Sequence, residues 1–141
     1  MSYQKLPSQK VLAKHLRCCT EIKTVPMSNG VQYLWKCQLD NRCFTILPSV
    51  WIQGIVVQVL DGNDIIIIDD GTGIIILSHC DNICSKVTAT KGMYIMAVGT
   101  LQSCGQNPVI RPIKLQDLSC IDHAETMWPL EVLDQMNFLK S

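Results

Sequence analysis

Runs of apolar residues separated by short polar turns fill the middle of the chain. Valine and isoleucine, which favour strands, dominate these runs. Gly, Asn and Asp lie between them in DGND (61–64) and DGTG (70–73), sequences typical of tight hairpin turns. The pattern predicts five consecutive strands, at residues 50–60, 65–69, 74–77, 92–102 and 109–118.

Five short strands joined in this way are the ground plan of a Greek-key barrel of the oligonucleotide/oligosaccharide-binding (OB) type. Gly54 and Gly99 interrupt the two longest runs, where glycine lets a strand bend enough to close a barrel. Residues 78–91 lie where such barrels often carry a helix, but HCDNICSKV allows only a short helical turn. We therefore predict an all-β fold with flanking helices, a five-stranded OB barrel followed by a C-terminal helix.

The segments on either side of the barrel have different patterns. Residues 1–49 are predicted to form an N-terminal extension that packs on or beside the barrel, with a short helix from Ser8 through Cys18 and a strand at 31–39. Residues 50–141 are predicted to form the barrel and its helix. Asp122 with Glu125 resembles a capping box at the start of this helix. Pro129 either kinks the helix or is its first residue, and we favour the second arrangement.

The second and third strands, IIIID (65–69) and IIIL (74–77), are apolar on both faces. One face belongs in the core, and the other needs cover from residues 1–49, from a helix or from another protein. A barrel that binds nucleic acid usually carries aromatic and basic residues on its strands. Here Tyr94 is the only aromatic residue in strands two to four. The pattern favours a protein interface, with a single-stranded nucleic-acid-binding module as the alternative.

Charge is unevenly distributed although the formal net charge is zero. Residues 1–49 contain seven basic and two acidic residues, whereas residues 50–141 contain five basic and ten acidic ones. An acidic barrel repels DNA, so we expect little or no direct DNA binding. No apolar run approaches the roughly 18 residues that span a membrane. The start of the chain has no signal-type stretch, so we expect an intracellular protein with reduced cysteines.

Motifs of catalysis are missing from the sequence. It contains no glycine-rich phosphate loop, no paired metal carboxylates and no nucleophile elbow, so we expect neither an enzyme nor a cofactor. Cys80, Cys84, Cys120 and His123, with His79 beside them, offer four tetrahedral ligands, but their spacing matches no recognised zinc pair. We expect no metal, and a zinc-stabilised domain remains a third hypothesis.

Four short segments carry a resemblance to a known family. VWIQGIVV, GMYIMAVGTLQSC, PIKLQDLS and HAETMWPLEV resemble, in order and spacing, the smaller subunit of the RecQ-mediated genome instability (RMI) complex. The resemblance runs from about Trp51 to the C-terminal helix. Pro129 departs from it by interrupting a segment that is regular helix in the family, and the isoleucine strands are more apolar than the family pattern.

The resemblance implies an OB-fold subunit without catalysis of its own, in a nuclear complex that dissolves double Holliday junctions. Its barrel would pair with the C-terminal OB barrel of a larger RMI subunit, much as two subunits of replication protein A pair. Through that subunit it would join a RecQ-type helicase and a type IA topoisomerase. A peptide from a Fanconi anaemia translocase is implied as a further partner of the paired barrels.

The last strand and the helix are the expected partner interface. Alternation places Ile113 and Leu115 toward the core, and therefore Ile110, Pro112 and Lys114 on the opposite face. The Lys114 side chain is either solvated or makes a polar contact at the centre of an apolar interface. The resemblance supports the interface contact. On the helix we expect Trp128 to anchor an apolar surface. The full predicted interface is Ile110, Pro112, Lys114, Trp128, Val132, Leu133 and Met136.

Overall fold

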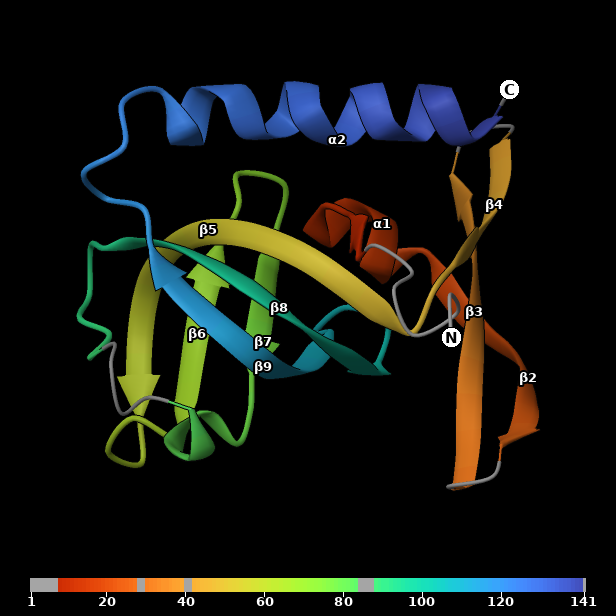
Figure 1. The fold of residues 1–141 in the computed structure, drawn as a ribbon, viewed down its shortest axis with the longest axis horizontal. Helices are drawn as coiled ribbons and strands as arrows, with labels where there is room; N and C mark the ends of the chain where they lie inside the picture. Colours follow the sequence, from red (N-terminus) through yellow and green to blue (C-terminus); the bar gives the residue numbers. More distant parts are fainter. Residues whose placement is uncertain (1–7, 28–29, 40–41, 84–87, 141) are drawn as a thin grey trace.

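A computed structural model of the chain describes residues 8–27, 30–39, 42–83 and 88–140 (Figure 1). All five predicted barrel strands are present, and the second and third have the predicted bounds. The fourth begins two residues later than its apolar run because Gly92 and Met93 belong to the preceding turn. The barrel strands are β5 (Ser49–Leu60), β6 (Ile65–Asp69), β7 (Ile74–Leu77), β8 (Tyr94–Ser103) and β9 (Val109–Asp117).

These strands close into a barrel. Their order is β5-β6-β7-β9-β8, and β8 pairs back with β5. Neighbouring strands are antiparallel except β7 and β9, which run parallel. Along the chain β8 lies between these two strands, but in the sheet β9 lies between β7 and β8. This crossover is a Greek-key path, and the prediction of a five-stranded OB barrel is confirmed. The link from β7 to β8 contains the 3₁₀ turn η2 (Cys80–Asn82), as expected.

The described part of residues 1–49 forms β1 (Gln9–Lys10), α1 (Ala13–Arg17) and a separate antiparallel sheet of β2 (Cys19–Met27), β3 (Gly30–Leu39) and β4 (Arg42–Ile46). The strand predicted at 31–39 lies within β3. The helix predicted from Ser8 is too long, because Gln9 and Lys10 pair in parallel with β5 instead. The Ser8 hydroxyl contacts the Ser49 hydroxyl at 2.8 Å, and Leu12 occupies the N-cap position.

One continuous core joins the barrel to this N-terminal part. Strand alternation turns Ile66, Ile68, Ile75 and Leu77 inward, and each is fully buried. Leu16 of α1 packs on the same cluster. The second sheet contributes four more buried members of the cluster: Cys19, Trp35, Cys37 and Ile46. Residues 1–49 therefore supply cover for the barrel interior from within the chain.

The C-terminal helix α2 (Ala124–Lys140) contains Pro129 in its interior, so the prediction that Pro129 starts the helix is wrong. The Met127 amide already donates a helical bond to the His123 carbonyl at 2.9 Å. His123, not Asp122, is therefore the residue before the helix, and it has a left-handed φ of 64°. Pro129 has no amide hydrogen, so the helix loses the hydrogen bond that this residue would donate to the carbonyl of Glu125. The helix tolerates the loss because it concerns a single bond near the helix start and Glu125 is exposed. Among the described residues, no helix combines the length and apolar character needed to cross a membrane.

Candidate functional site

Helix α2 lies across the outer face of the barrel, beside β1 and β5 (Figure 1). Its Trp128 ring stacks on Trp51 of β5 with the ring centroids 6.1 Å apart and the planes inclined by 27°. Trp128, Val132 and Leu12 form a buried cluster, which Trp51 and Met136 flank. An apolar contact between strand and helix thus fixes the position of α2.

Lys10 of β1 adds polar contacts to the same contact region. Its Nζ lies 3.1 Å from the Glu131 carboxylate of α2 and 4.9 Å from the centre of the Trp51 ring. Its backbone amide donates to Gln135 Oε1 at 2.7 Å. The short strand β1 therefore bridges β5 and α2. These contacts explain why the chain breaks its expected N-terminal helix at this point.

Two of the predicted interface residues on α2 do not reach the surface. Trp128 is 1% exposed and Val132 is fully buried, so their side chains hold α2 on its own barrel. The expectation that Trp128 presents itself outward as an anchor does not fit this arrangement. Met136 is half-buried at the edge of the same contact. Leu133 is 46% exposed and is available on the surface.

On β9 the predicted faces are wrong as well. Ile110 and Pro112 are buried, whereas Ile113, expected in the core, is 68% exposed. The cause is a bulge: Val98 pairs with Lys114 and Gly99 with Pro112, which leaves Ile113 without a partner on β8. The regular alternation of inward and outward side chains is therefore interrupted at Ile113, the extra residue of β9. After the bulge Lys114 points outward and Leu115 packs against the core, as predicted for those two.

Gly99 permits the close approach of the two strands at this bulge. A Cβ atom at Gly99 would collide with the carbonyl oxygen of Arg111 and lie 2.5 Å from the Cα of Pro112. Only glycine fits there without moving backbone. From the sequence, Gly99 is expected to let the strand bend. It also pairs closely with Pro112, a contact that the spacing of residues in the sequence does not reveal.

A second apolar row of α2 faces away from the barrel. Met127, Leu130 and Leu133 are three residues apart, so they are neighbours along the helix surface. They are 46%, 57% and 46% exposed. We call these three residues the α2 outer row. Helix α2 therefore has apolar residues on two opposite sides. One side packs on the barrel, and the other is exposed to solvent.

Lys114 lies on the same face of the sheet as Trp51. Trp51 pairs with Val98, and Val98 pairs with Lys114, so these three side chains share one face of neighbouring strands. Trp51 is covered in part by α2, Val98 is half-buried, and Lys114 is exposed. The candidate surface therefore has two parts: the α2 outer row and, on the barrel wall, Lys114 with the exposed Ile113.

The face that OB barrels commonly use for nucleic acid carries different side chains here. On the outside of β6 and β7, Ile65, Ile67 and Ile76 are half-buried and Ile74 is 36% exposed. Tyr94 offers no stacking surface because it is 8% exposed and its hydroxyl donates to Gln53 Oε1 at 3.0 Å. Burial raises the pKa of this phenol, which stays neutral.

Comparison with known families decides the relationship that the sequence indicated. The family model described as RecQ-mediated genome instability protein 2 matches residues 7–136. The chain belongs to this family. A family protein from Gallus gallus is 33% identical over 130 residues, covering 89% of each chain. One from Mus musculus is 29% identical over 133 residues, covering 92% of this chain and 83% of the mouse protein.

A solved structure supports the fold independently of sequence. The crystal structure of the S. pombe Stn1-ten1 complex contains a chain that superposes with a TM-score of 0.58 at 11% identity. The superposition covers 93% of both chains. At this identity the similarity establishes the OB architecture of this family member and nothing about its ligands.

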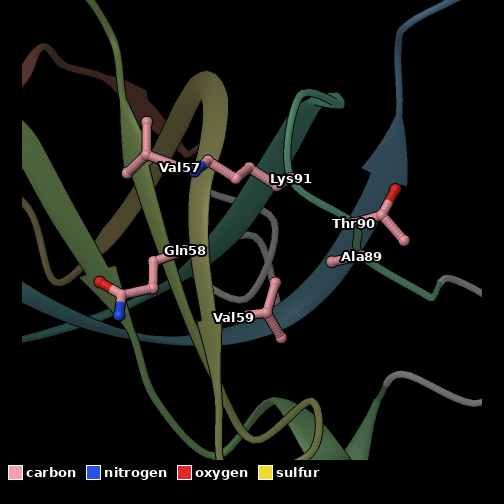
Figure 2. A pocket seen from close by; sticks show the side chains of 6 residues that line it. All are labelled: Val57, Gln58, Val59, Ala89, Thr90 and Lys91. Carbon is pink, nitrogen blue, oxygen red and sulfur yellow. The ribbon is translucent and has the colours of Figure 1, made fainter.

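Two further features of the described residues are a surface hollow and the candidate zinc ligands. A shallow hollow of about 590 Å³ lies between β5 and the loop before β8, and Figure 2 shows its lining: Val57, Gln58, Val59, Ala89, Thr90 and Lys91. Its polar side chains are the amide of Gln58, the hydroxyl of Thr90 and the ammonium group of Lys91. The candidate zinc ligand Cys84 lies outside the described residues. Within them, no three His, Cys, Asp or Glu side chains are grouped to hold a metal.

Proposed function

We propose that this member of the RecQ-mediated genome instability protein 2 family is a non-catalytic subunit of the RMI complex. Its OB barrel would pair with the C-terminal OB barrel of the larger RMI subunit. Family membership over residues 7–136 supports the assignment to the complex. The α2 outer row is the observation that supports a pairing role.

A helix that only completes its own domain needs one apolar side. Helix α2 already buries Trp128 and Val132 on the barrel. Met127, Leu130 and Leu133 add three large apolar side chains on the opposite side, where water would otherwise surround them. Covering such a row with apolar surface of another chain is favourable by about 25 cal/mol for each Å² removed from water.

Lys114 supplies a polar group at the other end of the proposed interface. It projects from the β9 wall beside the exposed Ile113 and in line with Val98. A single ammonium group bordered by apolar side chains suits a contact with a carboxylate or carbonyl of the partner, which fixes register. The revised interface therefore keeps Lys114, Leu133 and Met136 and adds Ile113, Met127 and Leu130. It assigns Ile110, Pro112, Trp128 and Val132 to internal packing.

In the cell, we place this pairing in a nuclear complex with a RecQ-type helicase and a type IA topoisomerase. The complex would dissolve double Holliday junctions and so protect genome stability during DNA replication and repair. This subunit would contribute to the stability of the complex, because binding between two folded chains shifts the folding equilibrium of each toward its folded state. The paired barrels would form a composite surface on which a Fanconi anaemia translocase peptide docks.

The test is co-expression of the chain with the C-terminal barrel of the larger RMI subunit, followed by size exclusion and titration calorimetry. We expect a 1:1 heterodimer. Leu130→Glu should raise its Kd at least about tenfold, because a charge would be buried against apolar surface. Gln106→Glu is the control: it adds the same charge at an exposed loop position away from the interface.

Lys114→Ala provides a second, independent position. It should weaken the heterodimer, whereas circular dichroism and thermal melting of each isolated variant should match the parent chain because all three positions are exposed. Failure of the parent chain to bind the larger subunit would contradict the proposal. Equal affinity of the Leu130→Glu and Gln106→Glu chains would remove α2 from the interface.

A further inference from the structure

Three thiols from distant parts of the sequence meet beside the barrel core. Cys19 begins β2, Cys37 lies in β3, and Cys104 follows the end of β8. The Cys19 thiol is within hydrogen-bonding reach of both the Cys37 and the Cys104 thiol. Cys19 also donates to the His15 carbonyl oxygen at 3.0 Å. Cys19 is therefore the central member of the group.

Backbone bonds hold the three residues in this arrangement. Cys19 and Cys37 are directly opposite in the antiparallel pair of β2 and β3. The Gln38 amide donates to the Cys18 carbonyl at 3.2 Å, so the next pair, Cys19 with Cys37, is a non-hydrogen-bonded pair with close side chains. On the other side, the Gly105 amide donates to the Leu16 carbonyl at 3.1 Å. That bond keeps the Cys104 loop against α1.

Solvent access differs among the three. Cys37 is fully buried and Cys19 is 7% exposed, whereas Cys104 is half-buried. A small oxidant from solution therefore meets the Cys104 sulfur first. The Cys104 thiol contacts the thiol of Cys19. An oxidised Cys104 would thus lie next to a thiol that can react with it.

We propose that Cys104 and Cys19 form a site of reversible oxidation that closes to a disulfide in the presence of hydrogen peroxide. In the first step the Cys104 sulfur attacks one peroxide oxygen, the O–O bond breaks, and water leaves, giving a sulfenic acid. In the second step the Cys19 sulfur attacks the Cys104 sulfur, the S–O bond breaks, and a second water leaves. Two thiols are oxidised and one peroxide is reduced.

The surroundings of the thiols slow this oxidation and favour a bond between Cys19 and Cys104 over one that includes Cys37. The contact with Cys104, together with burial, raises the pKa of Cys19 above the ordinary value, although the contact with Cys37 opposes this shift. The contact with Cys19, together with burial, raises the pKa of Cys37, and both shifts disfavour the reactive thiolates. Transfer of the new bond to the fully buried Cys37 is therefore slow. The Cys19–Cys104 bond would link the small sheet to the barrel loop and close a segment of roughly 85 residues, which restricts the unfolded chain.

The experiment treats the full chain with hydrogen peroxide, blocks remaining thiols with N-ethylmaleimide, and maps peptides by mass spectrometry without reduction. We expect a peptide pair joined through Cys19 and Cys104, and a melting temperature raised by roughly 5–10 °C. Dithiothreitol should reverse both changes. Cys104→Ser should abolish the linked pair, while Cys120→Ser, at an exposed position outside the group, should leave it intact.

The peptide map of the parent chain decides the proposal even if a variant folds poorly. A bond between Cys19 and Cys37 would overturn the assigned pair. Overoxidation of Cys104 with Cys19 still alkylated would show that the two sulfurs do not react with each other. Bonds formed only between molecules through Cys43 or Cys120 would also overturn the proposal.

Discussion

Trp51 and Trp128 stack with their ring centroids 6.1 Å apart, and this contact decides which side of α2 faces the barrel. Trp51 belongs to β5, the strand that pairs with three others, whereas Trp128 belongs to the helix that ends the fold. The stacked pair therefore attaches the terminal helix to the most connected strand. It also leaves the α2 outer row facing solvent.

Trp128→Ala should lower the free energy of unfolding by about 3–5 kcal/mol, because it empties a fully enclosed indole site. Trp128→Phe should cost less, since it keeps an aromatic ring and removes an indole N–H for which no described residue is an acceptor. Urea unfolding followed by circular dichroism measures both. Leu130→Ala, on the exposed side of the same helix, is the control and should change stability by about 0.5 kcal/mol or less. Similar losses for Trp128→Ala and Leu130→Ala would contradict the packing described for α2.

Gly99→Ala should destabilise the barrel by about 2–3 kcal/mol, since the added methyl meets the backbone of Arg111 and Pro112 rather than a movable side chain. The neighbouring Thr100→Ala removes an exposed side chain and should cost no more than about 1 kcal/mol. Thermal melting of the two variants gives the comparison. A Gly99→Ala chain as stable as Thr100→Ala would show that β9 can shift away from β8 at the bulge.

His15 should make stability depend on pH in a defined window. Burial, and secondarily the positive charge of Lys14, lower the pKa of this imidazole from 6.5 to about 4. Its Nδ1 accepts a hydrogen bond from the Leu12 amide at 3.0 Å, a contact that requires this nitrogen to be unprotonated. Above pH 6.5 the folded and unfolded states are both neutral at this group. Between about pH 6.5 and 4 the unfolded chain takes up a proton that the folded chain does not.

The free energy of unfolding should therefore fall as pH drops through that window, by up to about 3 kcal/mol from this group. His15→Asn should flatten this part of the stability profile, whatever its effect at neutral pH. His79→Asn, which replaces an exposed histidine in the left-handed conformation with a residue that tolerates it, should keep the slope. Urea midpoints between pH 4 and 7.5 measure the slopes. An unchanged slope in His15→Asn would contradict the assignment.

The nucleic-acid alternative predicts a different behaviour. The outer face of β6 and β7 carries isoleucines, with the exposed Asp61 in the turn before β6 and the exposed Asp69 at the end of β6. We therefore expect no binding of a fluorescent single-stranded oligonucleotide above background at 150 mM salt. A module that grips phosphates would bind and lose affinity steeply with salt. Fluorescence anisotropy between 50 and 300 mM salt separates the two, and tight binding with a steep slope would favour the alternative.

The sequence by itself determined the barrel. Alternation of apolar residues and the chemistry of the Gly, Asn and Asp turns are local, so β6 and β7 could be predicted to the residue. The order of strands followed from the limited number of ways in which five short strands close. The helix after Ser119 was also visible from its spacing, although its start at Ala124 was not.

Only the tertiary structure decided which surfaces are free. The extra residue at Ile113 reverses the faces of β9, because the close pairing of Gly99 with Pro112 is a contact between distant segments. Helix α2 is apolar on two sides, and spacing within one helix cannot tell which side the rest of the chain will bury. The contact of Trp128 with Trp51 makes that choice. Likewise Cys19 and Cys104 meet only because α1 and the β8–β9 loop are held together, a relationship that no local pattern encodes.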